Sequence, residues 1–246
     1  MKNEEHLVEV ENGEKVAAVH HRPESNSQKW MFFCHGFGSD KEGSYERRSN
    51  FFSEHGWNAV RFDFRGNGDS DGKFIEQDLS SRIRDLKAVL DRFKPQRYVL
   101  FGSSFGGKVA LTHAAESDPE AVIGRSPVTY NSIMDSFRSV VEEKGEFQHH
   151  PGATIDERFF DDLDRYSFGE TAEKIECPVA IFHGSEDTTV HPGNSVEAAG
   201  ELEDEVLLNL IESEKHSFSE EAERKMLAVT ETWLNSISMT DRNSIL

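Results

Sequence analysis

Apolar residues along the chain fall into two patterns that alternate with each other. Short continuous runs such as Trp30–Cys34 (WMFFC) are typical of strands covered on both faces of a sheet. Apolar residues at three- and four-residue steps, clearest over Leu79–Phe93, predict an amphipathic helix that stops near Pro95. The same patterns predict further strands over 6–10, 15–21, 58–62, 98–101, 121–123, 179–182 and 206–210, and helices over 44–55, 105–116 and 220–236. This alternation implies an α/β fold with a mostly parallel sheet flanked by helices.

Two segments depart from this alternation of strands and helices. Asn12-Gly13 lies between the first two strands and is a common hairpin turn, so those strands are predicted to pair antiparallel. Residues 127–168 carry scattered aromatic residues among charges and give no strand signal, which suggests a small cap inserted over the sheet edge. No low-complexity linker divides the chain. We therefore expect one domain over residues 1–246 with an inserted cap at about 127–168.

The charge balance limits the classes of partner that we expect. Asp and Glu number 46 against 27 Lys and Arg, and the net charge is −19. Such a surface repels nucleic acid and anionic membranes, so we expect neither as a partner. Two interpretations of the acidity stay open: adaptation to high salt, or an ordinary acidic enzyme. The oligomeric state is left open as well.

The chain offers no pattern typical of export, metal binding or cofactor binding. The first residues contain no continuous apolar stretch and no window approaches a bilayer span, so a soluble, cytoplasmic protein is expected. Cys34 and Cys177 are predicted to be free, buried thiols. The eleven histidines show no metal-ligand spacing, and we expect neither a metal nor a cofactor.

The most informative motif is Gly102-Ser103-Ser104-Phe105-Gly106-Gly107, which follows a strand and opens a helix. A GxSxG turn between a strand and a helix forces its central serine into a strained conformation, so small residues must lie two positions to either side. Gly102 and Gly106 meet that need. The motif therefore predicts Ser104 as a nucleophile at a helix N-terminus, where developing negative charge is favoured.

A serine nucleophile needs a base that is oriented by an acid, and in this fold they follow it in the order acid, then histidine. Asp187 lies in HGSEDTTV just after a predicted strand, and His216 lies in SEKHSF between the last strand and the last helix. Both are thus expected at the same sheet edge as Ser104. The competitors, Glu186 for the acid and His183 and His191 for the base, are less well placed.

An oxyanion site is predicted from the loop His35-Gly36-Phe37-Gly38, which follows the strand WMFFC. Backbone N–H groups suffice for this role, and we expect those of Phe37 and Phe105 to supply it. His35 is expected to brace the loop. The run Arg61 to Ser70 contains Gly66 and Gly68 but has Asp71 where a dinucleotide fingerprint needs its third glycine, so it is interpreted as a polar turn.

The motifs HGFGSDK, FDFRGNGDSDG, GSSFGG, HGSEDTTV and KHSF, in this order and spacing, resemble the α/β-hydrolase superfamily. Within it they are similar to compact carboxylesterases that include bacterial feruloyl (cinnamoyl) esterases. The resemblance implies an α/β-hydrolase fold, a triad of Ser104, Asp187 and His216, and oxyanion donors at Phe37 and Phe105. The usual histidine before the nucleophile is Ser103 here, and no cap residue can be matched.

The expected function is therefore a serine hydrolase that cleaves small-molecule carboxylic esters through an acyl-enzyme. A thioesterase, a peptidase or a lipase would use the same triad. A non-catalytic binding protein on this fold is the alternative from another class, although such proteins usually lack a triad member.

Overall fold

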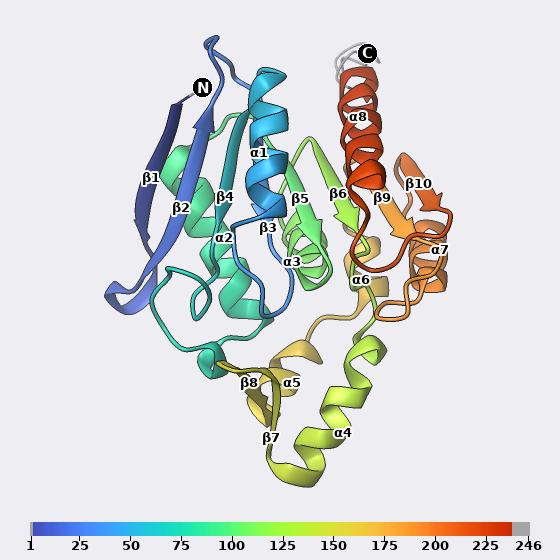
Figure 1. Ribbon diagram of the computed structural model, residues 1–246. Coiled ribbons are helices and arrows are strands. Elements are labelled where there is room, and N and C mark those ends of the chain that lie inside the picture. The colour runs from blue at the N-terminus through green and yellow to red at the C-terminus, as the bar shows by residue number, and fades with distance from the viewer. Residues whose placement is uncertain (1, 238–246) are drawn as a thin grey trace.

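The computed structural model describes residues 2–237 and contains a central eight-stranded sheet (Figure 1). The strand order is β1-β2-β4-β3-β5-β6-β9-β10. Strand β2 runs antiparallel to both β1 and β4, and every other neighbouring pair is parallel. The strands span β1 (Lys2–Glu9), β2 (Lys15–Arg22), β3 (Trp30–Cys34), β4 (Asn58–Phe62), β5 (Val99–Ser103), β6 (Ala121–Arg125), β9 (Val179–Gly184) and β10 (Val206–Ile211). The α/β architecture with a mostly parallel sheet is confirmed.

Helices cover both faces of this sheet. One face packs against α1 (Ser44–Glu54) and α8 (Glu220–Ile237), which lie side by side. The other face packs mainly against α2 (Leu79–Phe93) and α3 (Phe105–Ala114), as Figure 1 shows. Two shorter helices, α6 (Phe168–Ala172) and α7 (Pro192–Glu201), join the α2–α3 side, and single 3-10 turns occur at Glu11–Gly13 and Phe74–Glu76.

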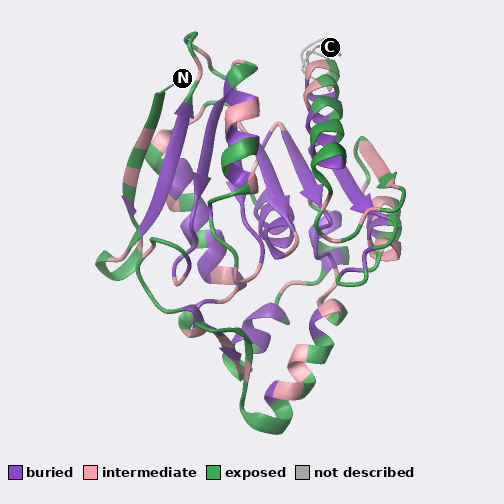
Figure 2. Ribbon diagram, viewed as in Figure 1, coloured by how far each residue is buried: buried purple, intermediate pink, exposed green. Residues whose placement is uncertain are grey.

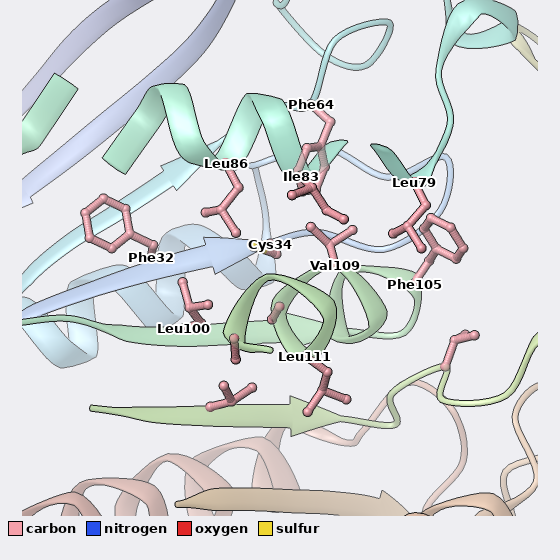
Figure 3. Packing of buried hydrophobic residues seen from close by; sticks show 14 of the residues in the cluster. Phe32, Cys34, Phe64, Leu79, Ile83, Leu86, Leu100, Phe105, Val109 and Leu111 are labelled. Atoms are coloured by element: carbon pink, nitrogen blue, oxygen red, sulfur yellow. The ribbon is translucent and has the colours of Figure 1, made fainter. Parts of the chain in front are cut away.

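Alternation along each central strand divides the core into two layers. In β3, Met31 and Phe33 pack on the α1–α8 side, whereas Phe32 and Cys34 pack on the α2–α3 side. Burial on both faces explains why β3 is apolar throughout. Figure 2 shows the central strands buried and β1 and β10 more exposed, with α1 and α8 buried along one side and α3 buried throughout. Figure 3 shows Leu86 from α2 and Val109 from α3 among the side chains that form this layer of the core.

The predicted elements hold with small shifts. The bounds of β3, β4 and α2 match the prediction, while β1 begins four residues earlier, at Lys2. Helix α7 was missed. Pro192 occupies its first turn and His191 caps it by accepting the Gly193 N–H at 3.1 Å, and both residues mark a helix start.

Most of the segment between β6 and β9, up to the end of α5, lies beyond the carboxyl ends of the parallel strands (Figure 1). It contains a 3-10 turn (Asn131–Met134), α4 (Asp135–Lys144), β7 (Glu146–His150), β8 (Ala153–Asp156) and α5 (Glu157–Leu163). The expectation that residues 127–168 hold no strand is wrong, because β7 and β8 pair antiparallel. Strand β7 has the sequence EFQHH and is mostly exposed, so no buried apolar pattern marks it. Among residues 2–237, no helix is long and apolar enough to cross a membrane.

Candidate active site

Ser104 lies at the sharp turn between β5 and α3. Its φ of 53° and ψ of −123° place it in a sparsely populated region for a residue with a side chain. A Cβ at Gly102 would lie 2.3 Å from the Gly106 carbonyl oxygen, and a Cβ at Gly106 would lie 2.1 Å from the Cys34 carbonyl oxygen. Only glycine fits at either position. The close approach of β3, β5 and α3 therefore maintains the strained serine at the start of the helix.

The loop after β3 lies against this turn. A Cβ at Gly36 would come within 3.3 Å of the Ser104 Cβ. The backbone N–H groups of Phe37 and Phe105 make no hydrogen bond to any residue that the structure describes. Two donors thus remain free beside Ser104, as an oxyanion site requires.

His35 holds that loop in place from within the core. Its Nδ1–H donates to the Gly36 carbonyl at 2.9 Å, and its Nε2 accepts the Phe64 N–H at 3.0 Å. Burial, reinforced by the charge of Arg82, lowers the pKa of His35 to about 3. The ring is therefore neutral at physiological pH, which suits one donating and one accepting nitrogen.

Asp187 and His216 lie together at the same edge of the sheet. The fully buried Asp187 accepts the His216 Nδ1–H on Oδ2 at 2.7 Å. Its Oδ1 accepts the N–H groups of Thr189 and Val190 at 2.8 and 3.0 Å. Burial alone would raise the pKa of Asp187, but hydrogen bonds from His183 and His216 hold it far below its usual range. The carboxylate is thus ionised and orients the His216 ring.

His183 has a role that the sequence did not indicate. It is fully buried, and its Nε2 lies 3.1 Å from Asp187 Oδ2 and 2.8 Å from the Val190 carbonyl oxygen. Its Nδ1 lies 2.7 Å from Ser195 Oγ. Two imidazoles therefore donate to one carboxylate oxygen. His183 braces the acid from behind, and the four-residue spacing between His183 and Asp187 was the available clue.

Ser104 and His216 line a single cavity of about 520 Å³ together with Phe37 and Phe105. Asp187 lies behind His216, outside the lining. The competing Glu186 is exposed, and the competing His191 is exposed at the start of α7. The structure thus brings together all five residues selected from the sequence, and none of the three competitors lines the cavity.

The segment after β6 contributes much of the remaining lining, through Ile133, Met134, Phe137 and His149. Phe37 makes ring contacts with Phe137 and His149 at centroid distances of 6.3 and 5.4 Å. The next residue, His150, donates from Nε2 to the Gly38 carbonyl at 2.6 Å. The segment is thus joined to the loop that carries the Phe37 N–H.

The run from Arg61 to Ser70 has a structural role. Asp63, in this run, accepts hydrogen bonds from the Lys41 ammonium at 2.8 Å and from the Asp69 N–H at 2.9 Å. This run is a tight polar turn, and a Cβ at Gly68 would lie 2.2 Å from Asp63 Oδ2. The turn is compact and closed by its own carboxylate.

Within residues 2–237, one group of side chains has metal-ligand spacing: Glu4, His6 and His20 on the β1–β2 hairpin. Glu4 is already paired with Lys2 and Arg22 at 3.0 and 3.2 Å, and these cations oppose a metal ion there. None of the three lines the active-site cavity.

The sequence and the fold both match known hydrolases. The family model described as serine aminopeptidase, S33, matches residues 25–146. The human mitochondrial palmitoyl-protein thioesterase ABHD10 is 28% identical over 191 residues, which cover 70% of this chain and 61% of that protein. The chain thus spans about three fifths of the length of such relatives.

Solved structures extend the likeness over nearly the whole chain. Est1E from Butyrivibrio proteoclasticus, solved with ferulic acid bound, superposes with a TM-score of 0.81 at 23% identity, covering 95% of this chain and 99% of that one. Mouse alpha/beta hydrolase domain-containing protein 10 gives a TM-score of 0.83 at 19% identity, with the same coverage. The order of the sheet, the strained serine after β5 and these likenesses together show that the chain has the α/β-hydrolase fold.

Proposed function

We propose that this protein is a serine hydrolase that cleaves carboxylic esters through an acyl-enzyme. The observation that carries the proposal is the convergence of three parts on one cavity. Ser104 and His216 line it, Asp187 orients His216 from behind the lining, and Phe37 and Phe105, whose backbone N–H groups have no partner among the described residues, line it beside Ser104. This is the arrangement that acyl transfer requires.

The reaction proceeds in two halves. His216 Nε2 takes the Ser104 Oγ proton as Oγ bonds to the ester carbonyl carbon, and the resulting oxyanion accepts the Phe37 and Phe105 N–H groups. His216 then passes the proton to the leaving alcohol oxygen as the carbon–oxygen bond breaks. Water repeats the sequence on the acyl-enzyme, which releases the acid and restores Ser104. Asp187 stabilises the imidazolium in both halves without taking its proton.

The lining favours an aromatic or medium-sized acyl group. Ile133, Met134 and Phe137 present apolar surface, and the predicted cap over 127–168 would then select the substrate. The ferulic acid bound to Est1E supports the same class. We also retain the predicted cytoplasmic location as part of this proposal.

Ser104→Ala tests the nucleophile. Hydrolysis of p-nitrophenyl butyrate should fall by at least about a thousandfold, because removal of a triad serine leaves only the oxyanion site and binding. Fluorophosphonate should label the wild type and Ser103→Ala but not Ser104→Ala. Labelling of Ser104→Ala would assign the nucleophile elsewhere, and an unlabelled, inactive wild type would favour a non-catalytic binding protein.

A thioesterase is the second candidate, because the relatives at 24–29% identity include several named palmitoyl-protein thioesterase. The same triad would attack a thioester. Matched butyryl oxygen esters and thioesters, compared by kcat/KM, distinguish the two. We expect the oxygen ester to be at least as good a substrate, and a thioester preference above about tenfold would favour the second candidate.

A further inference from the structure

A second pocket adjoins the active-site cavity, and no residue of the segment between β6 and β9 lines it. It has a volume of about 460 Å³ and lies between the first turns of α1 and α8 and the end of β6. Ser44, Arg125 and Ser217 line both this pocket and the active-site cavity. We call it the arginine groove, because its lining includes four arginines, namely Arg47, Arg48, Arg125 and Arg224.

Three of these arginines are not paired with a carboxylate. Arg48 is buried and bonded to Glu223, so those charges cancel. The exposed guanidinium groups of Arg47 and Arg224 make no ion pair or hydrogen bond with any residue between 2 and 237. The one other acidic group in the lining is the exposed Glu220. The groove is therefore a positive patch on a chain whose net charge is −19.

Arg125 connects this charge to the reaction centre. Its side chain is nine-tenths buried, and it donates to the His216 backbone carbonyl and, at 3.3 Å, to Ser103 Oγ. Its guanidinium also lies 5.2 Å from the centre of the Phe218 ring. A buried guanidinium is costly unless it is hydrogen-bonded and its charge is paired, and Arg125 is hydrogen-bonded but has no carboxylate partner among the described residues.

The location of the groove identifies which part of a substrate would reach it. His216 must protonate the leaving oxygen, so the leaving group departs on the His216 side of the cavity. The next residue, Ser217, is shared with the arginine groove. Ile133, Met134 and Phe137, from the segment between β6 and β9, line the active-site cavity but not the groove and suit the acyl group. Both α1 and α8 also begin at the groove, and the positive ends of their dipoles add to the arginine charge.

We propose that the arginine groove binds a carboxylate or phosphate on the leaving-group side of the ester. This rests on the proposed function and specifies its substrate class: esters whose alcohol part carries an anion. Guanidinium groups suit both anions because their N–H groups can bind two oxygens at once. The groove also offsets locally the repulsion that so acidic a chain exerts on an anionic substrate.

A matched pair of chromogenic esters tests the proposal. The anionic substrate is 4-butyryloxy-3-nitrobenzoate, and the neutral one is 4-butyryloxy-3-nitrobenzamide. Each rate is divided by the spontaneous hydrolysis rate of the same ester, which removes the difference in leaving-group reactivity. We expect the wild type to favour the anionic ester by about tenfold in kcat/KM, mainly through KM, and less at high salt.

The test variant is Arg47→Gln/Arg224→Gln, because both side chains are exposed and unpaired, whereas Arg125 also holds the His216 loop. The preference should fall by about three- to tenfold. The control is Arg84→Gln/Arg97→Gln, which removes the same charge from exposed sites paired with Glu11 and Glu120, outside the groove. It should keep the wild-type preference. Inorganic phosphate should inhibit the wild type competitively, and the groove variant less.

Three outcomes overturn the inference. A wild type that hydrolyses both esters equally well, with fluorophosphonate labelling intact, refutes anion binding but leaves the proposed function standing. A preference that both double variants reduce equally reflects overall charge, not the groove. A wild type that hydrolyses neither ester and takes no label removes the proposed function and the inference together.

Discussion

Two walls of the active-site cavity are built on different principles. The wall formed by loops after the parallel strands contains Ser104, His216 and the backbone of Phe37, and buried contacts fix each of them. The wall formed by the segment between β6 and β9 contains Ile133, Met134 and Phe137, which contribute apolar surface. The first wall supplies reactive atoms and charge, whereas the second supplies shape.

The difference shows how this fold can separate chemistry from selectivity. On the strand-end wall, a single added methyl group at Gly102 or Gly106 would overlap backbone atoms. On the segment wall, the contacts join side chains, such as the stacked rings of Phe137 and Phe147, whose centroids lie 4.3 Å apart. Substitutions on the first wall should therefore abolish activity or lower stability, while substitutions on the second should change which substrates are preferred.

The largest effect is expected for Asp187→Asn. Every group that touches this carboxylate is a donor: two backbone N–H groups on Oδ1 and two imidazoles on Oδ2. The amide oxygen of an asparagine would still accept the two backbone N–H groups, so its NH2 group would point toward His216. Nδ1 of His216 would then accept, and Nε2 would carry the proton and lose its capacity as a base. We expect kcat to fall by about a thousand- to ten-thousandfold.

The control for that variant is Glu186→Gln, at the neighbouring exposed position. Turnover of p-nitrophenyl butyrate by this control should match the wild type, because Glu186 does not line the cavity. Circular dichroism of both proteins verifies folding. A strong loss in Glu186→Gln together with retained activity in Asp187→Asn would reverse the assignment of the acid.

A smaller effect should appear in the pH dependence of stability, through His35 on the strand-end wall. Its pKa is lowered to about 3 by burial and by Arg82, whereas an unfolded histidine titrates near about 6.5. The unfolded state therefore binds the proton more tightly. The stability from neutral His35 is fully present above about pH 6.5 and is lost as the pH falls toward 3. Below pH 6.5, this residue alone should lower the free energy of unfolding by up to about 1.4 kcal/mol per pH unit.

Urea unfolding at pH 7 and pH 5 measures this dependence. The slope of the free energy of unfolding against pH should decrease in His35→Gln. It should persist in His150→Gln, which removes an exposed histidine of β7. Slopes are compared, because His35→Gln also loses hydrogen bonds to Gly36 and Phe64 at every pH. Equal slopes in the wild type and His35→Gln would show that the buried ring does not control the response.

The same contrast explains what the sequence could and could not predict. β3 was located correctly because burial on both faces makes it a continuous apolar run, and α2 because burial of one side imposes a period of three to four residues on its apolar positions. Ser104 was located because its strain demands glycines at fixed offsets. Strand β7 was missed because an exposed strand needs no apolar period, and its pairing with β8 is a long-range property. Arg125 and His183 were missed because their partners are distant in sequence or lie behind the site, although Arg125 follows a predicted strand at the catalytic edge.

The smallest expected effect concerns the segment wall, through Phe137→Ala. Phe137 is half-buried in the cavity lining and stacks on Phe147, so its removal enlarges the acyl side without touching Ser104 or His216. The kcat/KM values for p-nitrophenyl esters from acetate to octanoate should shift toward longer acyl groups by about three- to tenfold, the scale of one or two methylenes in a pocket. Ser139→Ala, on the exposed side of α4, is the control and should keep the wild-type profile. If Phe137→Ala instead lowered activity equally for all chain lengths, the segment would support the catalytic loop and not select the acyl group, and the division between the two walls would fail.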